Sequence, residues 1–165
     1  MLLFVMLCLK HKISDRLIGR ANELLHRLPP SFSIYSGDDA TAAALILMGA
    51  KGNISVTANI LPTRMHELCA AALAGDLATV RSLSRRMAAI NQALFIESNP
   101  IPVKWAMARM GLIPEGMRLP LTPLSAQYVD TVTSAMGDAG IRLHSPGPGF
   151  DLIDPPPARR SPASQ

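Results

Sequence analysis

The fold of this chain is most constrained by residues 33–61, which alternate between β-prone and helix-prone sequence. Ser33 to Ser36 is β-prone, the apolar run Ala40 to Met48 predicts a short helix, and the run Ile54 to Ile60 predicts a second strand. Two strands joined by a crossover helix must be parallel, and the crossover is right-handed. Because parallel strands need cover on both faces, this βαβ unit predicts part of a larger α/β sheet or barrel.

A pair of carboxylates precedes the predicted helix. Asp38 and Asp39 can cap it, because their oxygens accept the free N–H groups of the first helical turn. The same pair would also suit acid–base chemistry, although capping explains it with fewer assumptions. Gly49 and Gly52 end the helix, and since its residues are apolar nearly all round, we expect it to be buried.

Helical periodicity flanks this unit on both sides. Ser14 to Leu28 carries apolar side chains at helical spacing and is closed by a pair of prolines, and a further helix is predicted from Pro62 to Gly75. The apolar segment Met1 to Leu9 predicts a buried strand. Three strand–helix pairs in succession are typical of an α/β barrel or a doubly wound sheet, so we expect a partial barrel over residues 1–75.

The alternation then gives way to helices alone. Asp76 can cap a long helix, Leu77 to Phe95, whose apolar residues follow a three–four spacing typical of a helix that faces another helix. Those residues are Val80, Leu83, Met87, Ile90 and Leu94. Pro102 to Met110 predicts a second helix, and a third can begin at Ser125. We therefore expect a three-helix C-terminal domain over residues 76–143.

Composition narrows the classes of function. Hydrophobic residues make up 48% of the chain and charged residues 17%, which is typical of a soluble globular protein, whereas residues 144–165 are rich in Pro, Gly and Ser and predict a disordered tail. The net charge of +4 comes from arginines scattered over predicted helices, which does not indicate a nucleic-acid-binding surface.

The apolar segment Met1 to Leu9 is shorter than the roughly 20 residues of a membrane span, and its positive charges follow it instead of preceding it. We therefore expect neither a membrane anchor nor a leader peptide.

The cysteines point to a reducing compartment. Cys8 and Cys69 have no metal-ligand spacing and no framework of further cysteines, which suits a cytoplasmic protein. A single bridge between them stays open as the alternative.

Few residues carry an obvious chemistry. The chain has no Gly-rich phosphate loop, and His66-Glu67 lacks the second histidine of a zinc-protease motif, so we expect no metal site. In a barrel, functional residues lie at the carboxyl ends of strands, which here include Gly37 and the lysines Lys10 and Lys12. Gly37 would let a substrate approach the backbone, or would simply form the tight turn after its strand. A desolvated lysine at a strand end can form a Schiff base with a keto acid.

Five segments resemble the C-terminal half of the dihydrodipicolinate synthase (4-hydroxy-tetrahydrodipicolinate synthase) family. They are SGDDATA, GNISVTAN, AALAGD, ALFIESNPIPVKWA and RLPLTPL, within roughly residues 30–141. The resemblance implies an α/β fold, the C-terminal part of a (β/α)8 TIM barrel followed by a three-helix domain, and a homotetramer. It also implies a lyase that condenses pyruvate with aspartate semialdehyde in lysine (diaminopimelate) biosynthesis. No cofactor is implied, since pyruvate is held as a Schiff base on a lysine.

The resemblance also assigns site residues. The family's pyruvate-contacting glycine and isoleucine fall on Gly37 and Ile54. Counting back from Gly37 without gaps places the Schiff-base lysine at Lys12, with Lys10 as the alternative if the register slips by two. The paired threonines, the proton-relay tyrosines and the substrate-carboxylate arginine belong to the family's N-terminal half, which has no counterpart here.

We therefore expect a truncated or frame-altered synthase that is inactive alone. Two alternatives remain open. The chain could be a non-catalytic remnant or interaction module that packs through its helical domain, or a piece of another class I aldolase of the N-acetylneuraminate lyase superfamily. The segment NPIPVKW favours the synthases over the latter group.

Overall fold

The computed structural model describes residues 6–7, 15–29 and 31–143. Three short strands and a 3-10 turn are interleaved with helices in the first half, and helices alone follow. In chain order the elements are β1 (Met6–Leu7), α1 (Asp15–Arg27), β2 (Tyr35–Ser36), α2 (Ala42–Leu47), β3 (Gly52–Asn53), η1 (Thr57–Asn59), α3 (Pro62–Ala74), α4 (Leu77–Ala93), α5 (Ile101–Arg109) and α6 (Ala126–Asp138).

The strands form one parallel sheet in the order β1-β2-β3. Tyr35 of β2 pairs with Met6 on one side and with Gly52 on the other, so all three strands run in the same direction. The expectation of parallel strands joined by a helix is therefore confirmed. β1 lies within the segment for which a strand was predicted, and the neighbouring residues 1–5 and 8–14 lie outside the described part of the chain.

The predicted position of the second strand of the βαβ unit was wrong. The strand is Gly52–Asn53 instead of Ile54 to Ile60, and the later residues form a turn and the 3-10 helix η1. The physical reason is that the N–H groups of Val56 and Thr57 donate to the side chain of Asp39 and not to a neighbouring strand. The β-branched residues of the run Ile54 to Ile60 favoured a strand, but β-propensity measures how well a side chain fits a half-buried pleated sheet, and these residues form a turn.

The helices agree more closely with the predictions. α3 begins at Pro62 and ends at Gly75, whose φ of 73° is the left-handed conformation that glycine adopts readily. α4 begins after Asp76, whose carboxylate accepts the N–H of Thr79 at 3.1 Å. Ser125 precedes α6 but makes no capping bond, because its backbone N–H and hydroxyl both donate to the Glu97 carboxylate.

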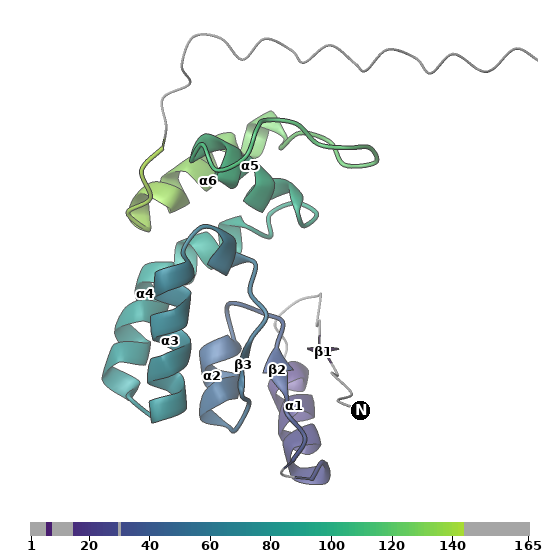
Figure 1. Ribbon diagram of the computed structural model, residues 1–165, viewed down its shortest axis with the longest axis vertical. Coiled ribbons are helices and arrows are strands. Elements are labelled where there is room, and N and C mark those ends of the chain that lie inside the picture. The colour runs from purple at the N-terminus through teal and green to yellow at the C-terminus, as the bar shows by residue number, and fades with distance from the viewer. Residues whose placement is uncertain (1–5, 8–14, 30, 144–165) are drawn as a thin grey trace, which may run out of the picture.

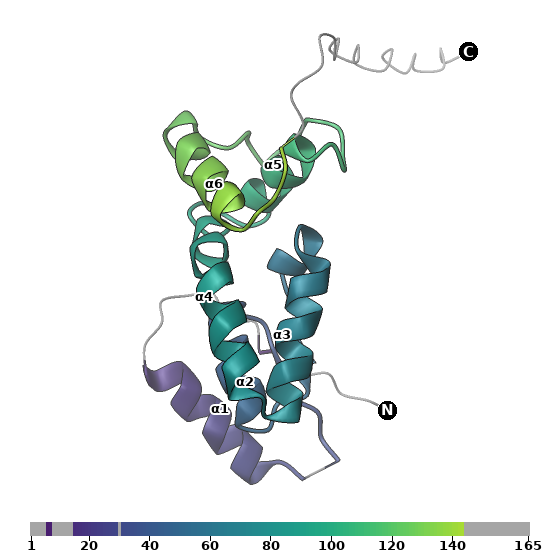
Figure 2. The same ribbon diagram turned by 90° about the vertical axis from the view of Figure 1, so that its left-hand side faces the viewer.

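Three helices, α2, α3 and α4, lie on one side of the sheet. Figure 1 shows α2, α3 and α4 together on one side of β2 and β3, and α2 and α3 make the main contacts of helices with the strands. α4 runs alongside α3 and reaches α6 at its far end (Figure 2). α4 therefore connects the strand–helix part of the chain to the last two helices.

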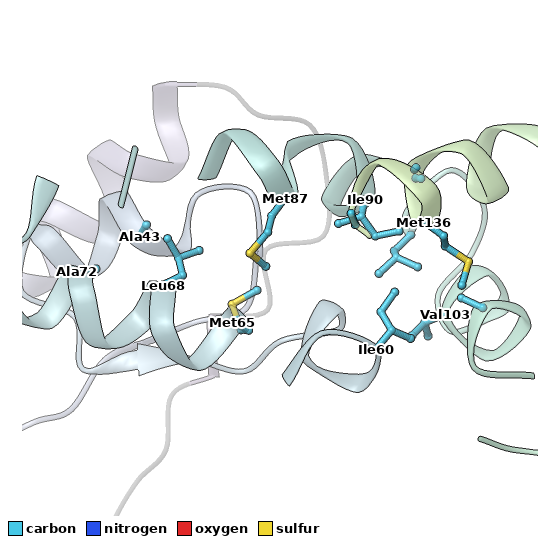
Figure 3. Packing of buried hydrophobic residues seen from close by; sticks show 14 of the residues in the cluster. Ala43, Ile60, Met65, Leu68, Ala72, Met87, Ile90, Val103 and Met136 are labelled. Atoms are coloured by element: carbon cyan, nitrogen blue, oxygen red, sulfur yellow. The ribbon is translucent and has the colours of Figure 1, made fainter. Parts of the chain in front are cut away.

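One hydrophobic core runs through both parts of the chain. Figure 3 shows it continuing from Ala43 and Leu68 through Met87 to Ile60 and Met136. The predicted apolar stripe of α4 is the centre of this core; its residues Met87, Ile90 and Leu94 are 0% exposed. Leu73 of α3 is 57% exposed. It follows the buried Ala72 by one residue and so lies about 100° further around the helix.

Candidate functional site

The two residues that the resemblance assigns to pyruvate contact lie next to each other in space. Gly37 directly follows β2, and Ile54 directly follows β3. The N–H of Ile54 donates to the carbonyl oxygen of Ser36 at 2.8 Å, so Ile54 is held beside the residue that precedes Gly37. The Ile54 side chain is 48% exposed. The carboxyl ends of two parallel strands thus present a backbone turn and an apolar side chain at the surface.

A buried carboxylate fixes this arrangement. Asp39 is 3% exposed, and its Oδ2 accepts the N–H groups of Val56 at 3.0 Å and Thr57 at 2.8 Å. Its Oδ1 accepts the side-chain amide of Asn53 at 2.7 Å. One side chain from the turn after β2 therefore holds both the end of β3 and the segment that follows Ile54. We call these residues, Asp39, Asn53, Val56 and Thr57, the Asp39 clamp.

The Asp39 clamp extends into helix α4. The Thr57 hydroxyl, in a fully buried side chain, donates to Oδ1 of Asn91 at 2.8 Å. The Asn91 amide donates in turn to the backbone oxygen of Asp39 at 3.3 Å. A polar chain of contacts thus connects the strand ends to the helix that carries the core.

The carboxylates of Asp38 and Asp39, which are adjacent in the sequence, have different roles. Asp38 behaves as predicted for a capping residue, because its Oδ2 accepts the backbone N–H of Thr41 at 3.1 Å and the Thr41 hydroxyl at 2.5 Å. Asp39 does not cap the helix. Its carboxylate instead accepts hydrogen bonds from backbone and side-chain amide groups, so it acts as a structural acceptor, which argues against acid–base catalysis by the Asp38–Asp39 pair.

Sequence reasoning missed the role of Asp39 and of Asn91. A signal for Asn91 was available, because it directly follows Ile90 in the apolar stripe of α4 and a buried amide needs a partner. Its partner, Thr57, is 34 residues away, and no local pattern connects the two.

The lysines proposed as nucleophiles, Lys12 and Lys10, lie outside the described residues, as does Cys8. Cys69 on α3 is a free thiol. Burial raises the pKa of the Cys69 thiol, and the negative charge of the Asp39 carboxylate raises it further. This thiol is therefore poorly suited to act as a nucleophile at neutral pH.

Two other classes of site have no support in the described part of the chain. No three His, Cys, Asp or Glu side chains there are grouped to hold a metal ion, and His66-Glu67 gains no partner of that kind. None of the helices at residues 15–29 and 31–143 is long and apolar enough to cross a membrane.

Comparison with known proteins gives a consistent result. The sequence profile of the dihydrodipicolinate synthetase family matches residues 6–139. The 4-hydroxy-tetrahydrodipicolinate synthase of Nitrosospira multiformis is 60% identical over 126 residues, which are 76% of this chain and 42% of that protein. The synthase of Nitrosomonas europaea is 57% identical over 126 residues and is covered to 43%.

Solved structures agree with the sequence relatives. The pyruvate complex of the Acinetobacter baumannii synthase superposes with a TM-score of 0.74 at 50% identity, over 78% of this chain and 44% of that one. The synthase of Aquifex aeolicus gives a TM-score of 0.76 at 36% identity, over 81% and 46%. The chain thus spans less than half the length of the relatives it matches. With the strand order, the strand-end site and these matches together, the chain belongs to the dihydrodipicolinate synthetase family.

Proposed function

We propose that this chain supplies the C-terminal part of a 4-hydroxy-tetrahydrodipicolinate synthase. That lyase condenses pyruvate with aspartate semialdehyde in the diaminopimelate route to lysine, in the cytoplasm. The observation that carries the proposal is the contact between the end of β3 and the end of β2, where the N–H of Ile54 meets Ser36, the residue before Gly37. The barrel strand ends are where such a site is expected.

In this proposal Gly37 and Ile54 form one wall of the pyruvate pocket. Gly37 has no side chain to keep a small planar keto acid away from the backbone, and the exposed Ile54 offers an apolar surface to its methyl group. Lys12 is the nucleophile: its neutral amine attacks the ketone carbon, water leaves, and an imine is formed. The Asp39 clamp positions the wall and takes no part in proton transfer.

The chain alone is inactive in this proposal. A proton relay and a substrate-carboxylate clamp contribute orders of magnitude to such rates, and the sequence lacks the family's groups for both. Purified chain should give no measurable condensation of pyruvate with aspartate semialdehyde, and borohydride reduction with pyruvate should trap little or no adduct. Turnover within about a hundredfold of an intact synthase would contradict this.

Trapping a stoichiometric pyruvate adduct tests which lysine is the nucleophile, even if the chain does not catalyse the condensation. If peptide mass mapping places such an adduct on Lys12, the pocket forms without the rest of the barrel, and the assignment of the nucleophile is correct. An adduct on Lys10 would support the alternative register. Replacement of either lysine by Arg keeps the positive charge and provides the matched control.

We also propose the division of the chain into a partial barrel at residues 1–75, a three-helix domain at 76–143 and a disordered tail at 144–165. Limited proteolysis should remove the tail and then the strands, leaving a core that starts between Leu61 and Asp76 and ends near Ile141. Uniform digestion, or a stable product that starts before β2, would contradict this division.

A non-catalytic packing module is the second candidate function. It is favoured by the continuous core of α4 and α6, in which Val132 and Met136 are 0% exposed, because this part needs no substrate pocket to be stable. The two candidates differ when the N-terminal part of a synthase is added to the chain: the synthase proposal then predicts a pyruvate adduct on Lys12, whereas a packing module predicts none.

A further inference from the structure

Asn91 is a polar residue within the apolar stripe of α4. It is 6% exposed, and its neighbour Ile90 is 0% exposed. Burying an amide in an apolar interior costs free energy unless its polar groups are hydrogen-bonded. An apolar side chain would pack at this position without that cost, so the packing of α4 alone does not explain why an amide is there. Its hydrogen bonds do.

The amide of Asn91 closes a ring of three hydrogen bonds. The backbone N–H of Thr57 donates to Oδ2 of Asp39 at 2.8 Å, and the Thr57 hydroxyl donates to Oδ1 of Asn91 at 2.8 Å. The Asn91 amide donates to the backbone oxygen of Asp39 at 3.3 Å and completes the ring. All three residues are buried. Because hydrogen bonds are directional, such a ring fixes the relative positions of its members. We call Asp39, Thr57 and Asn91 the Asn91 ring.

The Asn91 ring joins the two turns that carry the proposed pyruvate contacts. Asp39 follows Gly37 by two residues, and Thr57 follows Ile54 by three. The N–H of Ile54 also donates to the carbonyl oxygen of the last residue of β2 at 2.8 Å. The turns are therefore tied at two places, by this backbone bond and by the Asn91 ring.

The helix that carries Asn91 is firmly packed. Met87 and Ile90 of α4 are 0% exposed, and α4 packs against both α3 and α6. A group on a packed helix holds its contacts more precisely than a group on a loop. A displacement of about 1 Å at a substrate contact can cost about a hundredfold in rate. A residue of α4 can therefore control the reaction without touching the substrate.

We propose that Asn91 is a positioning residue for pyruvate. It acts through Thr57 and Asp39. The Asn91 ring sets the separation of Gly37 and Ile54, which are the two residues assigned to pyruvate contact. This inference rests on the proposed function, because that function assigns pyruvate to these residues.

The test opens the Asn91 ring without leaving the Thr57 hydroxyl unpaired. In the double variant Thr57→Val/Asn91→Leu both side chains keep nearly the same shape, and both partners of the hydrogen bond become apolar. Such a paired exchange is nearly neutral for stability, so the melting temperature should fall by no more than about 5 °C. Met87→Leu is the matched control, because it conserves volume at a fully buried position one turn earlier on α4.

Amide exchange in the full chain measures the positioning without any substrate. In the double variant the bond from the Ile54 N–H to Ser36 holds the strand ends without the ring, so exchange at Ile54 should be at least about tenfold faster. Exchange in α6 should not change, and Met87→Leu should leave Ile54 as it is. If the double variant fails to fold, Thr57→Val and Thr57→Ser replace it, since the first removes the hydroxyl and the second keeps it.

Borohydride trapping measures the effect on pyruvate. The chain is combined with the N-terminal part of the Nitrosospira multiformis synthase that precedes the matched region, and the trapped fraction is followed against pyruvate concentration. In the double variant the concentration for half-maximal trapping should rise at least about tenfold, while the maximal trapped fraction stays within about twofold. A merely structural role would lower the trapped fraction and leave that concentration unchanged.

The outcomes separate this inference from the proposed function. Unchanged exchange at Ile54 overturns the role of Asn91, and so does faster exchange without a rise in the pyruvate concentration needed for trapping. If the unaltered chain traps no pyruvate in the combined sample, the proposed function is contradicted instead. Exchange at Ile54 in the chain alone then decides whether the Asn91 ring fixes the strand ends.

Discussion

The strand ends and the helix α4 are stabilised in different ways. At the strand ends a single carboxylate, Asp39, accepts three N–H donors, and the strands themselves have two residues each. In α4 and at its C-terminal end the side chains of Met87, Ile90 and Leu94 are removed from water completely. Burial of apolar area is non-directional, whereas a hydrogen-bonded clamp fixes geometry. The comparison teaches that the helices provide stability and the clamp provides the shape of the site.

The largest expected effect comes from the helices. Ile90→Ala should lower the free energy of unfolding by about 2–5 kcal/mol, because it leaves a cavity in a fully buried position. Ile54→Ala, the matched change at the strand ends, should alter it by less than about 0.5 kcal/mol, since this side chain is half exposed. Urea unfolding of the two variants measures both values. Equal losses would show that the sheet is as well packed as the helices.

A smaller loss is expected when the clamp is removed. Asp39→Ala leaves the buried N–H of Thr57 without its acceptor and should cost about 1–3 kcal/mol. Asp38→Ala is the control, because Asp38 holds only the turn before α2, and we expect about 1 kcal/mol or less. Amide exchange at Val56 and Thr57 should accelerate only in the Asp39 variant. Acceleration in both variants would mean that the turn, and not the clamp, orders this segment.

The thiol of Cys69 reports on the same region through its pKa, which burial and then the Asp39 charge raise. A folded protein with a raised thiol pKa keeps its proton where the unfolded chain loses it, so stability falls as the pH rises above the usual thiol pKa. In a Cys8→Ser background, alkylation of Cys69 at neutral pH should be at least about tenfold slower than in urea. Cys69→Ser should remove the alkaline dependence. Equally fast alkylation in both states would contradict the burial of this thiol.

The smallest effect concerns the exposed cap of α4. Hydrogen bonds from the Thr79 hydroxyl and backbone lower the pKa of Asp76. Because the folded state holds this proton less tightly than the unfolded state, the cap stabilises the helix above the usual carboxyl pKa and loses this effect as the pH falls through the folded value. Asp76→Ala should cause a small drop in melting temperature at neutral pH and none in strong acid. A drop of equal size at both pH values would exclude a contribution from the charge.

The sequence was sufficient for the helices and insufficient for the strand ends. Pro62, Gly75 and Asp76 mark helix boundaries through backbone geometry and capping that act within a few residues, and the structure places the boundaries there. The position of β3 depends on which N–H groups donate hydrogen bonds to the Asp39 carboxylate. The donors Val56 and Thr57 are 17 and 18 residues away from Asp39 in the sequence. Long-range polar contacts of this kind leave no periodicity in the sequence. The positions of Gly37 and Ile54 as pyruvate contacts stay predictions from the resemblance.

The hydrogen bond between the Thr57 hydroxyl and the Asn91 side chain limits where segments of this protein can be replaced by segments of a related protein. It joins a residue before the boundary proposed at Asp76 to one after it, so a chimaera cut at that boundary would separate a hydroxyl from its acceptor. A foreign helical segment with an apolar residue at position 91 would leave the Thr57 hydroxyl unpaired in the interior. Exchanging Thr57 for Val in the same step would remove that mismatch. In a chimaera, positions 57 and 91 must therefore be taken from the same parent protein or changed together, wherever the segment boundary is placed.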